Sequence, residues 1–328
     1  MAIVNITSQG VSVGLKSNKL YVSDRKDIIK EIPINRIDRL NVFEGVKISS
    51  NLIEFAIENK IDINFMKSAG KYVGRISGGE KDCAELVRKQ IKLTGNEEFR
   101  INLAKKLIKS KINNQIVLLN RKNKDDIITE NLTQMKNMKK KLDFCEDVTE
   151  IMGYEGFASR EYFDGISKII NEEFSFKGRS RRPPRDMFNA MLSMSYSLLF
   201  SEIMTITSSK GLYFYAGFMH SDKKGHPSLI SDFMEEWRPV ICDSTVISII
   251  NKKWITRDAF NFNDDGSVYL NNKGLKILIE QMSKKFSSEI LYFDKKMSYR
   301  EALERQVDSF IEVLKNEDLS LYKISNIR

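Results

Sequence analysis

The stretch KYVGRISGGEKDCAELVRKQIKL, residues 71–93, contains the point at which the hydrophobic pattern of the chain changes. Before it, apolar residues recur in short alternating runs such as AIVNI, VSVGL and IDINFM, which is the period of β-strands. After the glycine pair at 78–79 they return every three or four positions, which is typical of helices. The sequence therefore predicts an α+β protein with a small amino-terminal β-rich domain, residues 1–79, and a larger, nearly all-α domain, residues 80–328.

Each of the two regions contains one exception to its pattern. SNLIEFAIEN, residues 50–59, has helical spacing behind Ser50 as a candidate cap, so one helix is expected among the strands. NFNDDGSVYLNNKG, residues 261–274, carries an Asp-Gly turn signal flanked by β-formers and predicts a hairpin or irregular loop. The helical segments are expected near 81–120, 126–144, 146–172, 184–208, 228–251, 272–288 and 298–316.

The charge balance favours a polyanionic partner, because 53 Lys and Arg face 44 Asp and Glu and the formal net charge is +9. The cysteines, Cys83, Cys145 and Cys242, match no zinc spacing and leave one unpaired in any disulfide scheme, so we expect reduced thiols. No signal-peptide pattern and no apolar run of membrane-spanning length is present. These features predict a cytoplasmic protein that does not act in a membrane.

Two basic clusters are candidates for contact with a phosphate backbone. Residues 100–124 carry eight Lys or Arg and no Asp or Glu, although a solvated helix face has the same composition. GRSRRPPRD, residues 178–186, sets four arginines around a proline pair just before a helical segment. An interdomain network of ion pairs is the alternative for this second cluster. The predicted DNA-binding residues are Arg179, Arg181, Arg182 and Arg185.

A histidine and several carboxylates form the candidate catalytic set. Glu155 lies in GYEGFASREYF, residues 153–163, where a plain helix-surface carboxylate is the alternative. His220 precedes a helical segment in which Asp232 and Glu235, three residues apart, share one face, although that face could equally be solvated. One histidine with two or three carboxylates suits Mg²⁺ or Mn²⁺ and phosphodiester chemistry. His226, the other histidine, is expected in the loop and not as a ligand.

Three of these motifs, in this order, resemble one family. They are GYEGFASREYF, RSRRPPRDMFNAMLSMSYSLL, and GFMH followed by SLISDFMEEWRP. Together they resemble the integrase and endonuclease of CRISPR adaptation, the CRISPR-associated protein 1 family, and weaker similarity extends the resemblance through the amino-terminal region. Phe214 departs from the proline of many relatives, and Glu235 is longer than the aspartate of some branches.

The resemblance implies a β domain used in homodimerisation and a helical catalytic domain with Mg²⁺ or Mn²⁺ held by Glu155, His220 and Glu235. Asp232 would support the site, while the direct third ligand stays open among Asp232, Glu235 and Glu236. The implied activity is insertion of short DNA fragments into a CRISPR array by attack of their 3′ hydroxyls on repeat phosphodiesters. The implied partners are DNA and the small second CRISPR-associated protein.

Two other hypotheses use the same residues differently. A structure-selective nuclease for branched DNA would use water as the nucleophile at the same site. A structural DNA-binding subunit would need the basic clusters alone, and its acidic residues would be incidental. Asn189 and Tyr196 could line the cleft or serve helix packing, and packing is the favoured interpretation.

Overall fold

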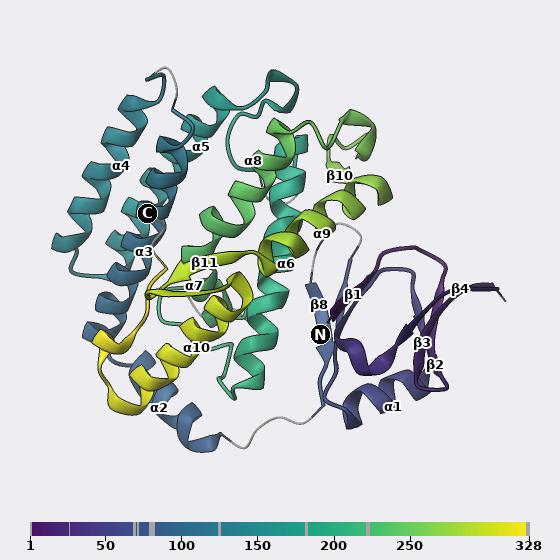
Figure 1. The fold of residues 1–328 in the computed structure, drawn as a ribbon. Helices are drawn as coiled ribbons and strands as arrows, with labels where there is room; N and C mark the ends of the chain where they lie inside the picture. Colours follow the sequence, from purple (N-terminus) through teal and green to yellow (C-terminus); the bar gives the residue numbers. More distant parts are fainter. Residues whose placement is uncertain are drawn as a thin grey trace.

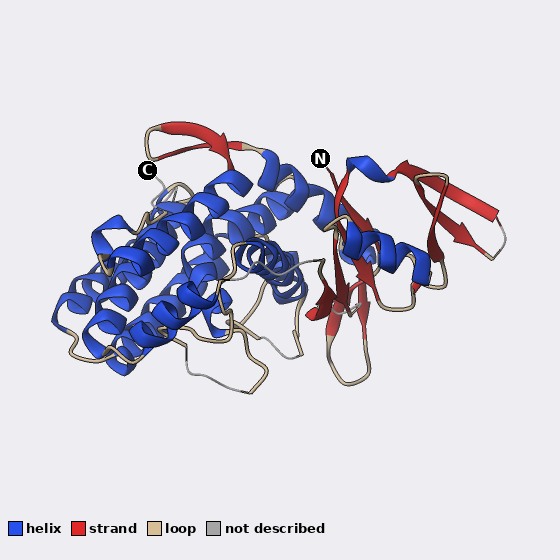
Figure 2. Ribbon diagram, turned by 90° about the horizontal axis from the view of Figure 1, so that it is seen from below, coloured by secondary structure: helices blue, strands red, loops and turns tan. Residues whose placement is uncertain are grey.

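The computed structural model describes residues 2–25, 27–67, 70, 72–78, 83–123, 126–180, 183–220 and 224–325. An amino-terminal group of strands lies beside a larger group of helices (Figure 1). Seen from below, most strands gather at one end of the molecule together with a short helix, while helices make up the larger remainder, from which a hairpin projects (Figure 2). The predicted α+β fold is confirmed. The predicted boundary between residues 79 and 80 lies outside the described residues.

Two four-stranded sheets form the amino-terminal region of the described chain, residues 2–76. One has the order β1-β5-β7-β8, with β8 antiparallel to its neighbour, and the other has the order β4-β3-β2-β6. Their bounds are β1 (Ala2–Ile6), β2 (Ser12–Lys16), β3 (Lys19–Asp24), β4 (Asp27–Pro33), β5 (Ile37–Phe43), β6 (Lys47–Ile48), β7 (Asp62–Met66) and β8 (Tyr72–Ile76). Alternating residues from both sheets meet the apolar face of α1 (Ser50–Glu58) in one core, as the strand period predicts.

The cap of α1 is Ser49 and not the predicted Ser50. Ser49 has an extended backbone, and its hydroxyl accepts a hydrogen bond from the backbone N–H of Leu52 at 3.3 Å. Ser50 already belongs to the helix. Two serines in succession offer the same capping chemistry, so only the backbone conformation decides between them.

The helices of the described residues agree closely with the predicted segments. Their bounds are α2 (Ala84–Thr94), α3 (Glu97–Asn120), α4 (Thr129–Lys141), α5 (Val148–Ile169), α6 (Met187–Ser209), α7 (Ser228–Trp237), α8 (Ser244–Asn251), α9 (Asn272–Ser287) and α10 (Tyr299–Asn316). Short 3₁₀ turns lie at Ile34–Arg36, Leu142–Phe144, Glu172–Phe174, Arg257–Ala259 and Leu319–Leu321. No helix of the described residues is long and apolar enough to cross a membrane.

Two predicted helices are interrupted. The segment 81–120 divides at Asn96, because the Asn96 side chain caps α3 by accepting the N–H of Phe99 at 3.0 Å. The segment 228–251 contains a π-helical turn, Arg238–Asp243, which begins next to Pro239, a residue without an N–H donor. The predicted hairpin is present as β9 (Phe260–Phe262) and β10 (Val268–Leu270). A second hairpin was not predicted and comprises β11 (Glu289–Tyr292) and β12 (Lys295–Ser298).

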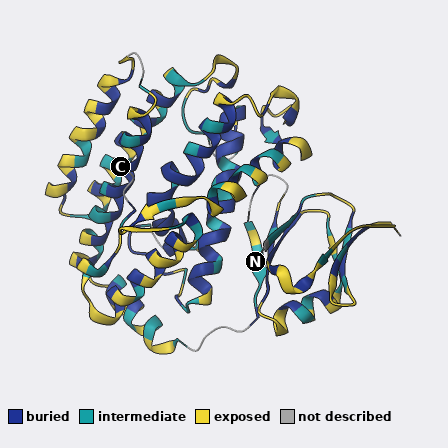
Figure 3. Cartoon of the chain, viewed as in Figure 1, coloured by how far each residue is buried: buried dark blue, intermediate teal, exposed yellow. Residues whose placement is uncertain are grey.

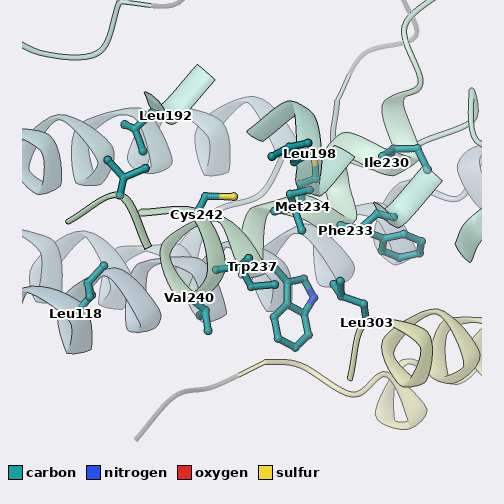
Figure 4. Packing of buried hydrophobic residues seen from close by; sticks show 14 of the residues in the cluster. Leu118, Leu192, Leu198, Ile230, Phe233, Met234, Trp237, Val240, Cys242 and Leu303 are labelled. Carbon is teal, nitrogen blue, oxygen red and sulfur yellow. The ribbon is translucent and has the colours of Figure 1, made fainter. Parts of the chain in front are cut away.

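Helices α6 and α7 form the centre of the helical half. Every residue of α7 is buried, and the dark interior of Figure 3 follows these two helices. Figure 4 shows Phe233, Met234 and Trp237 of α7 packed among residues of neighbouring elements, including Leu118 and Leu303. Trp237 is fully enclosed, and its indole N–H donates to Oε1 of Gln306 at 2.8 Å. The acidic residues of α7 therefore cannot belong to a solvated face.

A buried ion-pair cluster joins the strand region to the helices. The Glu202 carboxylate of α6 contacts Arg39 of β5 at 2.8 Å and Arg300 of α10 at 2.6 Å. Burial raises the pKa of Glu202, but the two arginines outweigh burial and hold the pKa below its ordinary value. Beside this cluster, the Asn64 amide of β7 donates to Ser201 Oγ at 2.8 Å. One face of the β1-β5-β7-β8 sheet is thereby fixed against α6.

Replacing Glu202 by Ala is expected to lower the free energy of unfolding by roughly 3–5 kcal/mol, since the buried Arg39 loses its partner. Urea denaturation measures the change. Glu31→Ala is the matched control, because Glu31 pairs with Lys19 at 2.8 Å where both side chains are over 40% exposed. It should cost about 1 kcal/mol or less. Equal small effects in both variants would show that the cluster does not hold the two regions together.

Candidate active site

The loop before α7 is bound to the helix by Asp232. The Asp232 carboxylate accepts hydrogen bonds from the backbone N–H groups of Phe218 at 2.6 Å, Met219 at 3.1 Å and His220 at 3.1 Å. A Cβ at Gly217 would lie 2.8 Å from Oδ2 of Asp232, so the loop passes this close only because residue 217 is glycine. The position of His220 is therefore fixed by its own backbone.

Asp232 also fixes the imidazole of His220. Oδ1 of Asp232 lies 2.7 Å from Nδ1 of His220. A carboxylate at Nδ1 favours the tautomer with the proton on that nitrogen, which leaves the lone pair on Nε2. Nε2 lies 3.9 Å from Oε1 of Glu235. Nε2 of His220 is thus available to a metal ion, whereas Nε2 of His226 lies 3.1 Å from the Ser231 hydroxyl.

Glu155 of α5 and Glu235 of α7 meet at the ammonium group of Lys111, which comes from α3. Lys111 Nζ contacts Oε1 of Glu155 and lies 2.5 Å from Oε2 of Glu235. Oε1 of Glu155 also accepts the Ser159 hydroxyl at 2.7 Å, and Arg238 lies 3.3 Å from Oε1 of Glu235. Three helices far apart in sequence therefore converge on one cluster.

The surrounding cations keep both carboxylates ionised. Burial raises the pKa of Glu235, but Arg238 and Lys111 outweigh it, and that pKa is lowered to about 2. Burial likewise raises the pKa of Glu155, and Lys111 again outweighs it and holds the pKa below its ordinary value. Both side chains are thus in the charged form that a divalent cation requires.

The three acidic residues of α7 have separate surroundings. Asp232 already accepts hydrogen bonds from three backbone N–H groups and lies against one imidazole, and these four partners fill the hydrogen-bond acceptor sites of a carboxylate. Glu236 points elsewhere and is bound by Ser110 at 3.0 Å, Gln306 at 3.0 Å, Tyr322 at 2.8 Å and the N–H of Ser325 at 2.6 Å. Burial raises the pKa of Glu236 to about 7. Of the three, Glu235 is the one placed toward Glu155 and His220.

The residues present suit a hard divalent cation. Glu155 and Glu235 supply ionised carboxylates and His220 an oriented nitrogen, the set that Mg²⁺ or Mn²⁺ accepts. Oε2 of Glu235 is buried and accepts no hydrogen bond of good geometry, although the Lys111 ammonium contacts it. Among the described residues no three His, Cys, Asp or Glu side chains already form a metal cluster. The lysine ammonium lies between the two carboxylates instead.

A basic and aromatic group lies directly beside these carboxylates. The Tyr196 ring is flanked by the guanidinium groups of Arg238, 4.9 Å from its centroid, and Arg179, at 5.2 Å. The Tyr196 hydroxyl donates to Asp243 at 2.7 Å, and so does the Tyr162 hydroxyl at 2.8 Å. Burial raises the pKa of Asp243 to about 6. Tyr196 therefore positions two arginines at the edge of the site.

The two described arginines of the predicted DNA-binding cluster have different partners. Arg179 donates to Oδ1 of Asn189 at 2.7 Å and extends toward the site, whereas Arg185 donates to the backbone carbonyl of Asp265 in the β9–β10 turn. Arg181 and Arg182 lie outside the described residues. Asn189 is fully buried and binds the loop before α6 through the carbonyl of Gly178 at 2.9 Å. Its contacts agree with the packing interpretation.

Sequence reasoning missed Lys111 and Arg238. Lys111 lies three residues after Ile108 and four after Leu107, both fully buried, so it occupies the apolar stripe of α3. A lysine in such a stripe needs a buried partner, and that signal was available. Arg238 lies one turn after Glu235, where the π-helical turn begins. That backbone change carries no clear sequence pattern beyond the neighbouring proline.

Comparison with known proteins places these features in one family. Residues 4–284 match the family described as CRISPR associated protein Cas1. The chain belongs to the Cas1 family. The CRISPR-associated endonuclease Cas1 of Mycobacterium tuberculosis is 30% identical over 288 residues, covering 87% of this chain and 85% of that protein. The family resemblance of the sequence motifs is confirmed.

Solved structures share the fold of this Cas1 chain. A casposase bound to its integration product superposes with a TM-score of 0.86 at 22% identity, covering 100% of this chain and 96% of that one. A chain of a Cas6-RT-Cas1–Cas2 complex gives a TM-score of 0.87 at 23% identity. This Cas1 chain spans only 36% of that longer polypeptide. At these identities the structures establish the fold.

Asp232→Asn is expected to weaken Mn²⁺ binding by about 10–100-fold, the usual effect of losing a partner that orients a ligand. An asparagine side chain has one oxygen in place of two and cannot accept all four hydrogen bonds. Calorimetric titration of the purified chain with Mn²⁺ measures the affinity.

His226→Ala is the control for this measurement, because His226 is not a proposed ligand: its Nε2 lies 3.1 Å from the Ser231 hydroxyl, and its ring packs 6.3 Å from the ring of His220 between centroids. It should bind Mn²⁺ within about threefold of the unchanged chain. Equal affinities for the Asp232→Asn chain and the unchanged chain would contradict the orienting role of Asp232.

Proposed function

We propose that this Cas1 chain is a divalent-metal-dependent DNA endonuclease and integrase that inserts short DNA fragments into a CRISPR array. The observation that carries the proposal is the convergence of Glu155, Glu235 and the Asp232-oriented His220 on one partly buried, cation-lined cluster. Family membership supports an endonuclease function, because relatives are named CRISPR-associated endonucleases. The casposase with its integration product shares the fold.

In the proposed reaction, a 3′ hydroxyl oxygen of the fragment bonds to a phosphorus of the repeat as that phosphorus loses its bond to the repeat's 3′ oxygen. The hydroxyl proton is released and the leaving oxygen takes up a proton, so the number of phosphodiester bonds is unchanged. Mg²⁺ or Mn²⁺ held by Glu155, His220 and Glu235 would polarise the phosphate and stabilise both oxygens. The chain itself supplies the ionised ligands, the oriented imidazole and the nearby guanidinium groups.

The basic side chains at the edge of the site are the proposed phosphate contacts. Arg179 and Arg238 flank Tyr196 beside Glu235, where their planar donors can hold phosphate oxygens. Arg181, Arg182 and Arg185 are proposed to bind the backbone farther along. In the helix that carries Glu155, Cβ atoms added at Gly153 and Gly156 would meet nothing within 4 Å, so α5 leaves open space at these two positions.

The proposed assembly contains more than one chain. Homodimerisation through the strand-rich region and binding of the small Cas2 protein are proposed from the family, and a structure titled as a Cas1–Cas2 complex supports the second. The alternative function is a structure-selective nuclease for branched DNA, in which water attacks at the same site. Both functions require the same ligands, so only the product distinguishes them.

Glu155→Gln and His220→Ala are each expected to lower joining by more than about a hundredfold, since even residues that merely orient ligands typically cost 10–100-fold. The assay incubates a fluorescent fragment having free 3′ hydroxyls with a repeat-containing plasmid, the Cas2 partner and Mn²⁺. Joined product is measured on a denaturing gel. Glu161→Gln is the control on the same helix, where Glu161 accepts from Asn131 at 2.9 Å and does not contact the cluster.

The products separate the hypotheses. Covalent joining by the unchanged chain supports integration, whereas hydrolysis of branched DNA without joining supports the nuclease alternative. Full activity in Glu155→Gln and His220→Ala, with DNA binding intact, would contradict the proposed site, because its acidic residues and histidine would then be incidental to the reaction.

A further inference from the structure

A lysine ammonium lies where the proposed metal site requires positive charge. Lys111 Nζ contacts Oε1 of Glu155 and lies 2.5 Å from Oε2 of Glu235. We propose that Lys111 is a placeholder cation, meaning that it holds the two carboxylates together until a divalent cation displaces it. Lys111 thereby sets the metal affinity of the site. This inference rests on the metal-dependent function proposed above.

The ammonium and a divalent cation compete for the same two oxygen atoms. A magnesium ion binds carboxylate oxygens at about 2.0–2.1 Å and repels a second positive charge at close range. Lys111 lies too close to Oε2 of Glu235 to keep its position when that oxygen becomes a ligand. Its flexible four-carbon stem allows the ammonium to move while the backbone of α3 stays in place.

The two carboxylates need a shared cation when no metal is bound. Glu235 is only 4% exposed, and Glu155 approaches it through the same ammonium group. Arg238 contacts Glu235 at 3.3 Å and His220 Nε2 lies 3.9 Å from it, but among the described ion pairs Lys111 is the cation that joins both carboxylates. Without it, the buried carboxylate of Glu235 and the partly buried carboxylate of Glu155 would face each other as like charges.

Lys111→Met tests the proposal, because methionine keeps an unbranched side chain of similar length and removes the charge. Calorimetric titration with Mn²⁺ is done on the purified full chain without DNA. The dissociation constant should fall at least roughly tenfold, since a competing unit charge is lost at short range. In metal-free buffer the variant should also melt at a lower temperature, and Mn²⁺ should raise its melting temperature more than that of the unchanged chain.

Lys106→Met is the matched control. Lys106 lies on the same helix, where its ammonium donates to the backbone carbonyl of Leu319 at 2.7 Å. The substitution removes the same charge from α3 without touching Glu155 or Glu235. Its Mn²⁺ affinity and its Mn²⁺-induced change in melting temperature should equal those of the unchanged chain. A tenfold gain in this control as well would overturn the proposal, because the effect would then follow net charge.

Two further outcomes keep this proposal separate from the proposed function. If the unchanged chain binds Mn²⁺ and loses binding in Glu155→Gln, but Lys111→Met binds with equal or weaker affinity, the placeholder role fails while the metal site stands. If Glu155→Gln binds Mn²⁺ as tightly as the unchanged chain, the proposed metal site itself fails.

Lys111→Gln is the second variant, because glutamine removes the charge and keeps a hydrogen-bond donor for Glu155. Tighter Mn²⁺ binding by this variant supports the proposal, and unchanged binding overturns it.

Discussion

Helix α7 carries three carboxylates in the interior of the helical region, and the need to compensate them determines what surrounds it. Asp232, Glu235 and Glu236 are each less than 5% exposed. A buried carboxylate without partners is strongly unfavourable, so each has its own set of donors or cations. The loop backbone satisfies Asp232, while Lys111 and Arg238 compensate Glu235. Hydroxyl, amide and backbone donors enclose Glu236.

This division gives the three acids different roles. Asp232 orients an imidazole, Glu235 stays ionised beside Glu155, and Glu236 joins the carboxy-terminal segment to α3 and α10. Helix α3 contributes Ser110 to the contacts of Glu236 and Lys111 to those of Glu235. Two consecutive residues therefore serve the fold and the site. The buried contacts of α6 extend the same framework to the strand region.

The fold was largely predictable because strands and helices differ in the spacing at which apolar residues recur, and the local sequence shows that spacing directly. The strand region, the helical segments and the β9–β10 hairpin agree with the structure. Breaks at Asn96 and Arg238 were missed because they depend on a single cap and on a π-helical turn. For the site, residue chemistry and spacing made Glu155, His220, Asp232 and Glu235 candidates, and the family resemblance added the assignment of Glu155, His220 and Glu235 as metal ligands. The apolar stripe of α3 indicates that Lys111 is buried, but its role between Glu155 and Glu235 depends on contacts between three helices distant in sequence.

The most direct test of this account is the anomalous scattering of Mn²⁺ in crystals of the full chain. A single peak within about 2.5 Å of carboxylate oxygens of Glu155 and Glu235 and of Nε2 of His220, with the Lys111 ammonium displaced, is the expected result. A peak bound by other residues, or Lys111 still between the two carboxylates with no peak beside them at saturating Mn²⁺, would contradict it.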